Sequence, residues 1–237
     1  MSALTSWLDR TYFAAFDKNW DDQMLRESVL RVLRPDSIIL DLGAGAGIVT
    51  QMDFRGHAAR ICGIDLDPRV VDNPFIDEGK VTDGRDIPFA DATFELVVSD
   101  NVLEHLEHPQ AVFSEVCRVL KPGGMFLFKT PNKYHYMPII ARITPTKFHG
   151  YVNRLRGRAE IDTFPTKYRA NCPRDIRDLA NKTGFAVGAI ELVEGRPEYL
   201  RFSFPTYLLG LAYYYLVTRL AVLRPFRILL IGRLIKL

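Results

Sequence analysis

A glycine-rich turn at the end of an apolar segment most constrains the fold of this chain. Residues 38–47 read Ile-Ile-Leu-Asp-Leu-Gly-Ala-Gly-Ala-Gly. The apolar run predicts a buried strand, and Gly43, Gly45 and Gly47 predict a turn whose backbone a ligand can approach closely. We expect a helix after the turn, with its N–H groups directed into the same space. A dinucleotide fingerprint would need Gly or Ala where Ile48 stands, so the spacing favours another nucleotide-type ligand.

Acidic residues also mark the ends of the next predicted strands. Residues 60–68 read as a short buried strand that ends in Asp65, whose carboxylate can accept two hydrogen bonds from a ribose diol. Asp67 suits this role less well because a proline follows it and ends the strand. Further along, Asp83 lies in a loop where it could accept from an exocyclic amine, and Asp100 ends another buried strand. The repeated pattern predicts a nucleotide-type site at the carboxyl ends of the strands.

The motifs over residues 38–130 resemble those of the class I S-adenosylmethionine-dependent methyltransferases, in particular the bacterial group that methylates small molecules and lipids. The resemblance implies S-adenosylmethionine as the cofactor. Its motif positions fall on Asp41, Gly43, Ala44, Gly45 and Gly47 for the methionine end, Asp65 and Leu66 for the ribose and adenine, Asp83 and Gly84 for the adenine edge, and Asp100 and Asn101 beside the sulfonium. A nicotinamide enzyme and an inactive relative of the same fold are the alternatives.

Strands and helices are expected to alternate from residue 38 to residue 130, which predicts right-handed βαβ units on a mostly parallel sheet. The resemblance implies an α/β fold with a doubly wound, seven-stranded, Rossmann-like sheet and an antiparallel last strand. We expect a single domain over residues 1–237 with a helical cap over residues 1–34. Proline at the start and glycine at the end predict a helix over residues 173–184.

The predicted alternation stops over residues 131–172. Long insertions in compact domains are usually lids or binding segments, and this one follows the fifth strand, which places it over the carboxyl ends of the strands. The insertion is basic and rich in aromatic residues. We therefore expect an acceptor-binding lid that prefers an anion, with the candidate contacts Tyr134, Arg154, Arg156 and Arg158. A solvated basic face is the alternative.

The tail of the chain, residues 205–237, is strongly apolar, and the whole segment from residue 201 onward contains no acidic residue. Its length alone would allow a membrane span. However, residues 226–236 have the look of the final antiparallel strand, which makes residues 205–223 the crossover helix before it. That helix is apolar nearly all the way round. We expect this face to form either a homodimer interface or a peripheral contact with a bilayer.

Methyl transfer requires above all that the acceptor be aligned. Near-attack positioning supplies on the order of 7 to 11 kcal/mol, and a general base about 2 to 5 kcal/mol. The candidate catalytic residues are His105 and His149, with His108 and His135 as further histidines, and the reaction can also proceed without a base. The segment around His105 resembles the metal-binding segment of quinone-pathway O-methyltransferases, but Asn101 stands where those enzymes have Glu, so we expect no metal.

Composition sets the remaining expectations. The chain has 237 residues, a mild net charge of +3 and three cysteines without a CxxC pair, which fits reduced thiols in a cytoplasmic protein. Its first residues lack the features of a signal peptide. We expect a cytoplasmic enzyme, peripheral at the inner face of the membrane if the tail binds lipid, that methylates an oxygen of a small-molecule or lipid-linked acceptor and does not act on DNA. An RNA or protein methyltransferase and a noncatalytic binding protein are the rival hypotheses.

Overall fold

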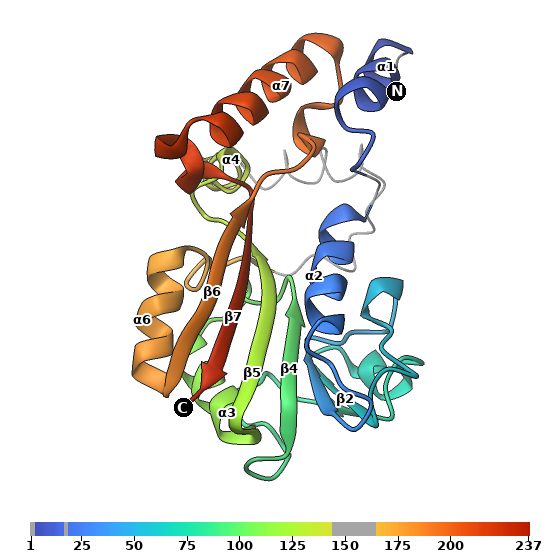
Figure 1. Cartoon of the computed structure of the whole chain (residues 1–237), viewed down its shortest axis with the longest axis vertical. Coiled ribbons are helices and arrows are strands. Elements are labelled where there is room, and N and C mark those ends of the chain that lie inside the picture. The colour runs from blue at the N-terminus through green and yellow to red at the C-terminus, as the bar shows by residue number, and fades with distance from the viewer. Residues whose placement is uncertain (1–2, 17–18, 144–164) are drawn as a thin grey trace. The chain divides into compact units, whose positions relative to one another are not determined.

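The computed structural model describes residues 3–16, 19–143 and 165–237, which form two compact units built from interleaved segments (Figure 1). The sheet unit comprises residues 21–130, 167–191 and 230–237. The helical unit comprises the described residues among 1–20, 131–166 and 192–229. Each of the last two strands of the sheet has one end in the helical unit. The chain therefore passes repeatedly between the two units.

One seven-stranded sheet has the order β3-β2-β1-β4-β5-β7-β6 (Figure 1). The strands are β1 (Ile38–Leu42), β2 (Arg60–Asp65), β3 (Glu78–Val81), β4 (Phe94–Asp100), β5 (Leu120–Pro131), β6 (Phe185–Val193) and β7 (Leu229–Lys236). The strands β1 to β5 pair in parallel, with Ile39 opposite both Ile61 and Leu96. β7 runs antiparallel. This topology confirms the predicted α/β sheet with an antiparallel last strand.

Helices cover both faces of the sheet because successive strand residues point to opposite sides. On β5, Leu127 packs in one cluster with Leu25 of α2 (Trp20–Leu30). The neighbouring Phe126 and Phe128 instead contact Phe113 of α3 (Pro109–Val119). The predicted helix before β6 is confirmed as α6 (Pro173–Thr183), which packs beside α3 and ends at a glycine in the left-handed region.

The helix expected after the glycine turn is absent from the described structure, and the predicted strict alternation is wrong here. Only the three-residue 3₁₀ turn η1 (Thr50–Met52) lies between β1 and β2, and only η2 (Pro68–Asp72) lies between β2 and β3. Met52 and Phe54 instead pack into the cluster beneath α2, which covers that face.

The predicted N-terminal helical segment divides into two helices, one in each unit. α1 (Ala3–Tyr12) packs in the helical unit, where Leu8 and Phe13 form a buried cluster with Tyr207 of α7 (Phe204–Arg219). α4 (Tyr136–Ile143) belongs to the same unit and contacts α7 through Tyr136. This helical arrangement leaves the outer faces of α1 and α7 for solvent or a partner.

The tail contains the two predicted elements with shorter bounds. α7 begins at a capping box made by Ser203 and Thr206 and ends at Arg219, because the 3₁₀ turn η5 (Ala221–Phe226) with its internal proline replaces the last helical turn. A further 3₁₀ turn, η4 (Glu198–Leu200), precedes α7. Within the part of the chain described here, no helix combines the length and apolar character needed to cross a membrane.

Candidate functional site

Three carboxylates lie at the carboxyl ends of three adjacent parallel strands of the sheet unit. Asp41 is on β1, Asp65 ends β2 and Asp100 ends β4. Because neighbouring parallel strands end at the same edge, the three side chains gather there. Asp41 is only 5% exposed. The strand order therefore brings together the acidic residues that the sequence predicted to act at one site.

The glycine turn after β1 is shaped for close approach to its backbone. Gly43, Gly45 and Gly47 have φ values of 87°, 52° and 71°, which disfavour any residue with a side chain. A methyl group at Gly43 would lie 2.1 Å from Cγ2 of Val102. The amide of Gly45 donates to Oδ2 of Asp65 at 2.8 Å. The turn is thus tied to the end of β2, and bare backbone is exposed beside the carboxylates.

Asn73 fixes the glycine turn from the other side and was not identified from the sequence. Its side-chain amide donates to the carbonyls of Ala44 at 2.9 Å and Gly45 at 3.2 Å, and its Oδ1 accepts from the amide of Phe75 at 2.9 Å. Added bulk at Gly47 would collide with Asn73 at 2.4 Å. The buried side chain of Asn73 therefore holds the glycine turn in place, although the sequence predicted that a following helix would do this. Only the proline that follows Asn73 in the sequence hints at such a fixed position.

Asp65, and not Asp67, presents its carboxylate at the strand end. Oδ1 of Asp65 accepts from the amide of Asp67 and Oδ2 from the amide of Gly45, both at 2.8 Å, which leaves a further lone pair on each oxygen. The carboxylate of Asp67 is occupied by the guanidinium of Arg69. Leu66 between them is exposed. The carboxylate of Asp65 is therefore more available than that of Asp67, and the role of Asp65 as acceptor for a diol stays a prediction.

Two buried carboxylate oxygens lack a donor. Oδ1 of Asp41 and Oδ2 of Asp100 have no hydrogen-bond partner among the described residues. Burial, together with the charges of Asp100 and Asp65, raises the pKa of Asp41 to about 8. Burial, together with Asp22 and Asp21, raises the pKa of Asp100 to about 7 against the opposing effect of Lys129. A cationic ligand with N–H donors would satisfy both oxygens and offset the accumulated negative charge.

Lys129 is the cation inside this acidic cluster and was not singled out from the sequence. Its fully buried ammonium lies 2.8 Å from Asp21 and 2.9 Å from Asp100, and it also bonds Asp22. Burial alone would lower the pKa of Lys129, but these three carboxylates raise it above its usual value. The available signal was a lysine within the apolar strand β5, because a buried lysine needs carboxylate partners.

We expect the ligand-free protein to lose stability as the pH rises from 7 to 9. The folded-state pKa values of Asp41, Asp100 and Glu194 lie above the ordinary values of 3.8 for Asp and 4.5 for Glu, so the folded protein binds more protons than the unfolded chain in this range. Urea unfolding at both pH values measures the change. Asp41→Asn removes one titrating group and should flatten the dependence. Equal or greater stability at pH 9 would contradict the assigned burial of these carboxyls.

The candidate catalytic histidines differ in where they lie in the structure. Nε2 of His105 lies 3.9 Å from Oε1 of Glu104, and the half-buried imidazole follows the end of β4. Oε2 of Glu104 accepts from Thr130 at 2.9 Å. His149 lies outside the described residues. His135 is 1% exposed and its ring contacts those of Tyr136 and Tyr213, so its imidazole is shielded from solvent.

The remaining predicted contacts are distributed over both units. Asp83 accepts from Nε of Arg85 at 2.6 Å, which lowers the pKa of Asp83. Gly84 is buried with φ of 78°. Asn101 has φ of 53°, an uncommon conformation that aims the chain after β4, and its amide donates to the carbonyl of Lys129 at 3.0 Å.

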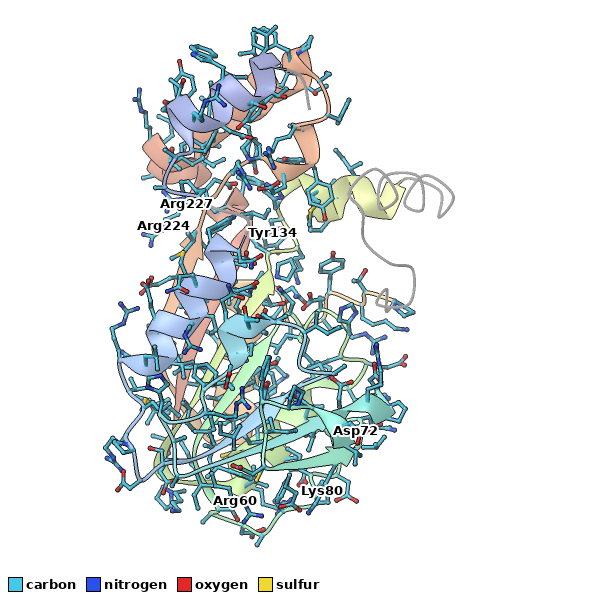
Figure 2. All side chains as sticks on the ribbon, turned by 90° about the vertical axis from the view of Figure 1, so that its right-hand side faces the viewer. Arg60, Asp72, Lys80, Tyr134, Arg224 and Arg227 are labelled. Atoms are coloured by element: carbon cyan, nitrogen blue, oxygen red, sulfur yellow. The ribbon has the colours of Figure 1, made fainter. Side chains whose placement is uncertain are left out.

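The predicted acceptor contacts lie in the insertion after β5. Tyr134 is exposed in the helical unit, with Nζ of Lys133 5.6 Å from its ring centroid (Figure 2). Arg154, Arg156 and Arg158 lie outside the described residues. Among residues 3–16, 19–143 and 165–237, no cluster of three His, Cys, Asp or Glu side chains could hold a metal ion.

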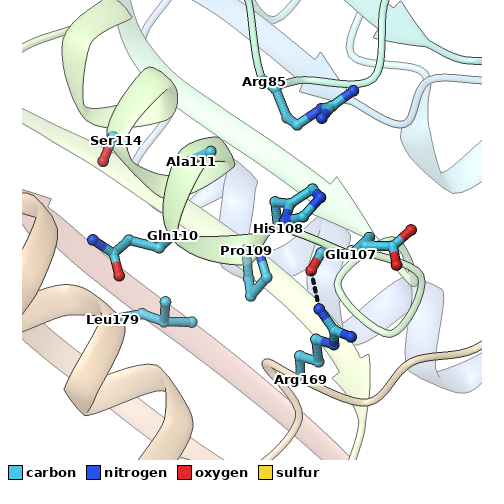
Figure 3. Close-up of a pocket in the computed structure, with 9 residues that line it drawn as sticks. All are labelled: Arg85, Glu107, His108, Pro109, Gln110, Ala111, Ser114, Arg169 and Leu179. Atoms are coloured by element: carbon cyan, nitrogen blue, oxygen red, sulfur yellow. Dashed lines mark hydrogen bonds between the residues drawn. The ribbon is translucent and has the colours of Figure 1, made fainter.

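An open groove of about 670 Å³ lies on the sheet unit beside the start of α3 (Figure 3). Its lining includes Arg85, His108 and Arg169, and Arg169 donates to the carbonyl of Glu107 at 2.6 Å. None of the three strand-end carboxylates lines this groove. The orphaned oxygens identify the candidate site better than cavity size does, because buried polar groups without partners are uncommon in folded proteins.

Comparison with known proteins shows what the central part of the chain is similar to. Residues 40–128 match the family model described as a methyltransferase domain. A probable S-adenosylmethionine-dependent methyltransferase of Mycolicibacterium smegmatis is 34% identical over 47% of this chain and 44% of its own length. A ubiquinone biosynthesis O-methyltransferase of Nitrosococcus oceani is 29% identical over 62% of this chain and 65% of its own length. The chain thus spans less than two thirds of either relative.

Structural comparison extends the likeness in fold beyond the family match. A protein solved in complex with the methyltransferase activator Trm112 of Haloferax volcanii has a TM-score of 0.60. The two chains are 19% identical, and the alignment covers 98% of this chain and 94% of the other. At this identity the likeness concerns the fold alone.

Proposed function

We propose that residues 40–128, which match the methyltransferase-domain family, form a class I S-adenosylmethionine-dependent methyltransferase domain, and that the protein transfers a methyl group from this cofactor to an oxygen of a small anionic or lipid-linked acceptor. The single observation that carries the proposal is the pair of buried, donor-free carboxylate oxygens on Asp41 and Asp100. An anionic cofactor would worsen their charge repulsion. A cofactor with an ammonium and a sulfonium would relieve it.

The residues at the strand ends fit this cofactor by their chemistry. Asp41, together with the backbone of Gly43, Ala44, Gly45 and Gly47, would hold the methionine end. Asp65 would accept from the ribose hydroxyls through its remaining lone pairs, with Leu66 covering one side of the adenine. Asp83 and Gly84 would meet the adenine edge, and Asp100 and Asn101 would flank the sulfonium. When bound, S-adenosylmethionine supplies an electrophilic methyl group.

The residues of the protein would contribute to the reaction by their negative charge and by the positions in which they hold the reactants. Asp100 is kept beside the site by Lys129, whose other two partners hold α2 to the same cluster. The resulting excess of carboxylates would favour the positively charged sulfonium of S-adenosylmethionine. The thioether product has lost that charge and would be bound less strongly. His105 would take the proton from an acceptor hydroxyl, with Glu104 steadying the imidazolium that forms.

Oxygen is the proposed acceptor atom because a half-buried imidazole follows the end of β4, and because the Nitrosococcus oceani relative is named an O-methyltransferase. An anionic acceptor is proposed from the basic residues of the insertion after β5, namely Arg154, Arg156 and Arg158, with Tyr134 as an aromatic contact. His149 from the same insertion is a second candidate base.

Turnover of the cofactor tests the proposal directly. Purified protein would be incubated with S-adenosylmethionine and separate pools of lipids, glycan precursors, quinone precursors and RNA, and S-adenosylhomocysteine would be measured. We expect product with a pool of small or lipid-linked acceptors, and loss of that product in Asp65→Ala. Product with RNA alone would overturn the proposed acceptor class. No product with any pool, together with no cofactor binding, would overturn the activity.

We expect replacement of the basic residues of the insertion to affect the acceptor and not the cofactor. The triple variant Arg154→Ala, Arg156→Ala, Arg158→Ala should raise the acceptor KM about tenfold or more, because charge-assisted contacts to an anion are lost. The Kd for S-adenosylmethionine should stay within about twofold of the parent value. A matched control replaces three arginines of the sheet unit: Arg31, Arg34 and Arg174. If the control raises KM equally, or if Kd and KM change together, the insertion does not bind the acceptor.

A further inference from the structure

The solvent-facing side of α7 is apolar along the whole helix. Its exposed positions follow helical spacing and form one stripe, here called the α7 stripe: Pro205, Leu208, Leu209, Ala212, Leu216 and Leu220 at its end. Leu209 is 67% exposed, and Val222 just beyond the helix is 79% exposed. A helix on the surface of a soluble protein usually presents charged and polar residues to water. The stripe inverts that pattern, which marks an interaction surface.

The buried side of the same helix shows that this exposure is not a packing accident. Tyr207, Gly210 and Val217 point inward, and Tyr207 stacks on Phe13 within the core of the helical unit. Tyr214 also packs on Phe13, with ring centroids 4.9 Å apart. α7 is therefore satisfied on its inner face by its own unit, and the outer stripe remains for another surface.

Aromatic residues of α1 continue the surface beside α7. Trp7 and Tyr12 are exposed and meet edge to face, and Tyr12 meets Tyr215 of α7 in the same way at 6.4 Å. The guanidinium of Arg219 lies 4.7 Å from the centroid of the Tyr215 ring. Exposed Trp and Tyr beside an arginine are typical of segments that lie at a bilayer interface.

The charges around the stripe are positive. Arg219 and Arg224 are exposed at its end, and Arg224 projects away from the ribbon (Figure 2). Arg10 is exposed on α1. From residue 199 to residue 237 the chain has no Asp or Glu. The nearest acid of α1, Asp9, is already held by Arg201 and Tyr207.

This charge pattern distinguishes between the two kinds of occupant. In a two-fold dimer the patch would face a copy of itself, which brings further basic residues but no Asp or Glu from α7, and whose Asp9 on α1 is already bonded, so Arg219 and Arg224 would gain no acidic partner. A bilayer with anionic headgroups offers negative charge to the arginines and an apolar layer to the leucines. We propose that the α7 stripe, with the aromatic residues of α1, docks the helical unit on an anionic lipid surface. This docking involves none of the cofactor residues and is independent of the proposed methyl transfer.

Vesicle flotation without cofactor or acceptor tests the docking. The full chain would be mixed with vesicles of phosphatidylcholine alone or of phosphatidylcholine with phosphatidylglycerol. We expect at least about tenfold stronger binding to the anionic vesicles, since each basic residue near such a surface adds to the attraction. Leu209→Glu combined with Leu216→Glu should weaken that binding about tenfold or more, because apolar contact is lost and repulsion added. A matched control introduces glutamate at Val71 and Val81, which are exposed on the sheet unit.

A second variant keeps the test valid if the double glutamate variant does not fold. Arg219→Ala combined with Arg224→Ala leaves the apolar stripe intact and should reduce binding to anionic vesicles to nearly the level seen with phosphatidylcholine alone. The proposal is overturned if the parent protein does not float with anionic vesicles, or if it floats equally well with all variants. A dimer in gel filtration that the glutamate variant dissociates, without flotation, would assign the stripe to a second copy and also overturn it.

Discussion

Replacing Lys129 by methionine is expected to lower the free energy of unfolding by about 3 to 5 kcal/mol, because a buried cation is removed from a cluster of carboxylates. Its ammonium is fully buried and bonds Asp21, Asp22 and Asp100. Because methionine has a volume similar to that of lysine, the loss of stability would come from the missing charge and not from a cavity. Urea unfolding at pH 8 and pH 5.5 measures the effect, which should be smaller at the lower pH where the stranded carboxylates can take up protons.

The matched control for this variant is Lys121→Met on the same strand. Lys121 pairs with Glu95, but its side chain is 42% exposed, so its loss should cost no more than about 1 kcal/mol. Lys129 does not neutralise the buried acidic cluster if Lys129→Met lowers the free energy of unfolding no more than the control does. The same conclusion follows if the loss of stability does not depend on pH. The account of Asp100 as a carboxylate held beside the site would then fail as well.

Asp65→Ala is expected to weaken binding of S-adenosylmethionine by about 2 to 3 kcal/mol, because two charge-assisted hydrogen bonds to the ribose are lost. The same carboxylate also accepts from the amides of Gly45 and Asp67. The glycine turn should therefore loosen too, which adds to the loss of affinity. Calorimetric titration of parent and variant gives the difference.

Asp67→Ala is the control for this effect, since Asp67 lies on the same loop and its carboxylate is held by Arg69. Its affinity for the cofactor should match that of the parent. Equal affinity in Asp65→Ala and the parent would contradict the assignment of Asp65 to the ribose. An equal loss in both variants would show that the loop, and not the Asp65 carboxylate, determines binding.

The sheet and its acidic edge could be predicted from the sequence because both follow local patterns. Apolar runs that end in Asp41, Asp65 and Asp100 indicate buried parallel strands, and parallel strands must end at the same edge. The final antiparallel strand was placed by the resemblance and by its apolar residues. Its start moved to Leu229 because the internal proline of η5 favours a turn before it.

Long-range packing limited what the sequence could predict. Asn73 reaches the glycine turn across 29 positions of the chain, and Lys129 meets Asp22 across 107 positions. Neither pairing has a local pattern. The missing helix after Gly47 has a related cause: α2, from the start of the chain, covers the face where that helix was expected. Which face of α7 is exposed was likewise decided by its packing against α1.

Titration of the purified full chain with S-adenosylmethionine at pH 8 is the decisive test of whether the buried carboxylates bind this cofactor. We expect saturable binding at one site that weakens as the pH falls from 8 to 6, because Asp41 and Asp100 must release protons to face a cation. The Asp41→Asn variant should bind S-adenosylmethionine more weakly than the parent at pH 8, and its affinity should change less with pH. Absence of saturable binding, or binding that strengthens as the pH falls, would contradict the assignment of the buried carboxylates to this cofactor.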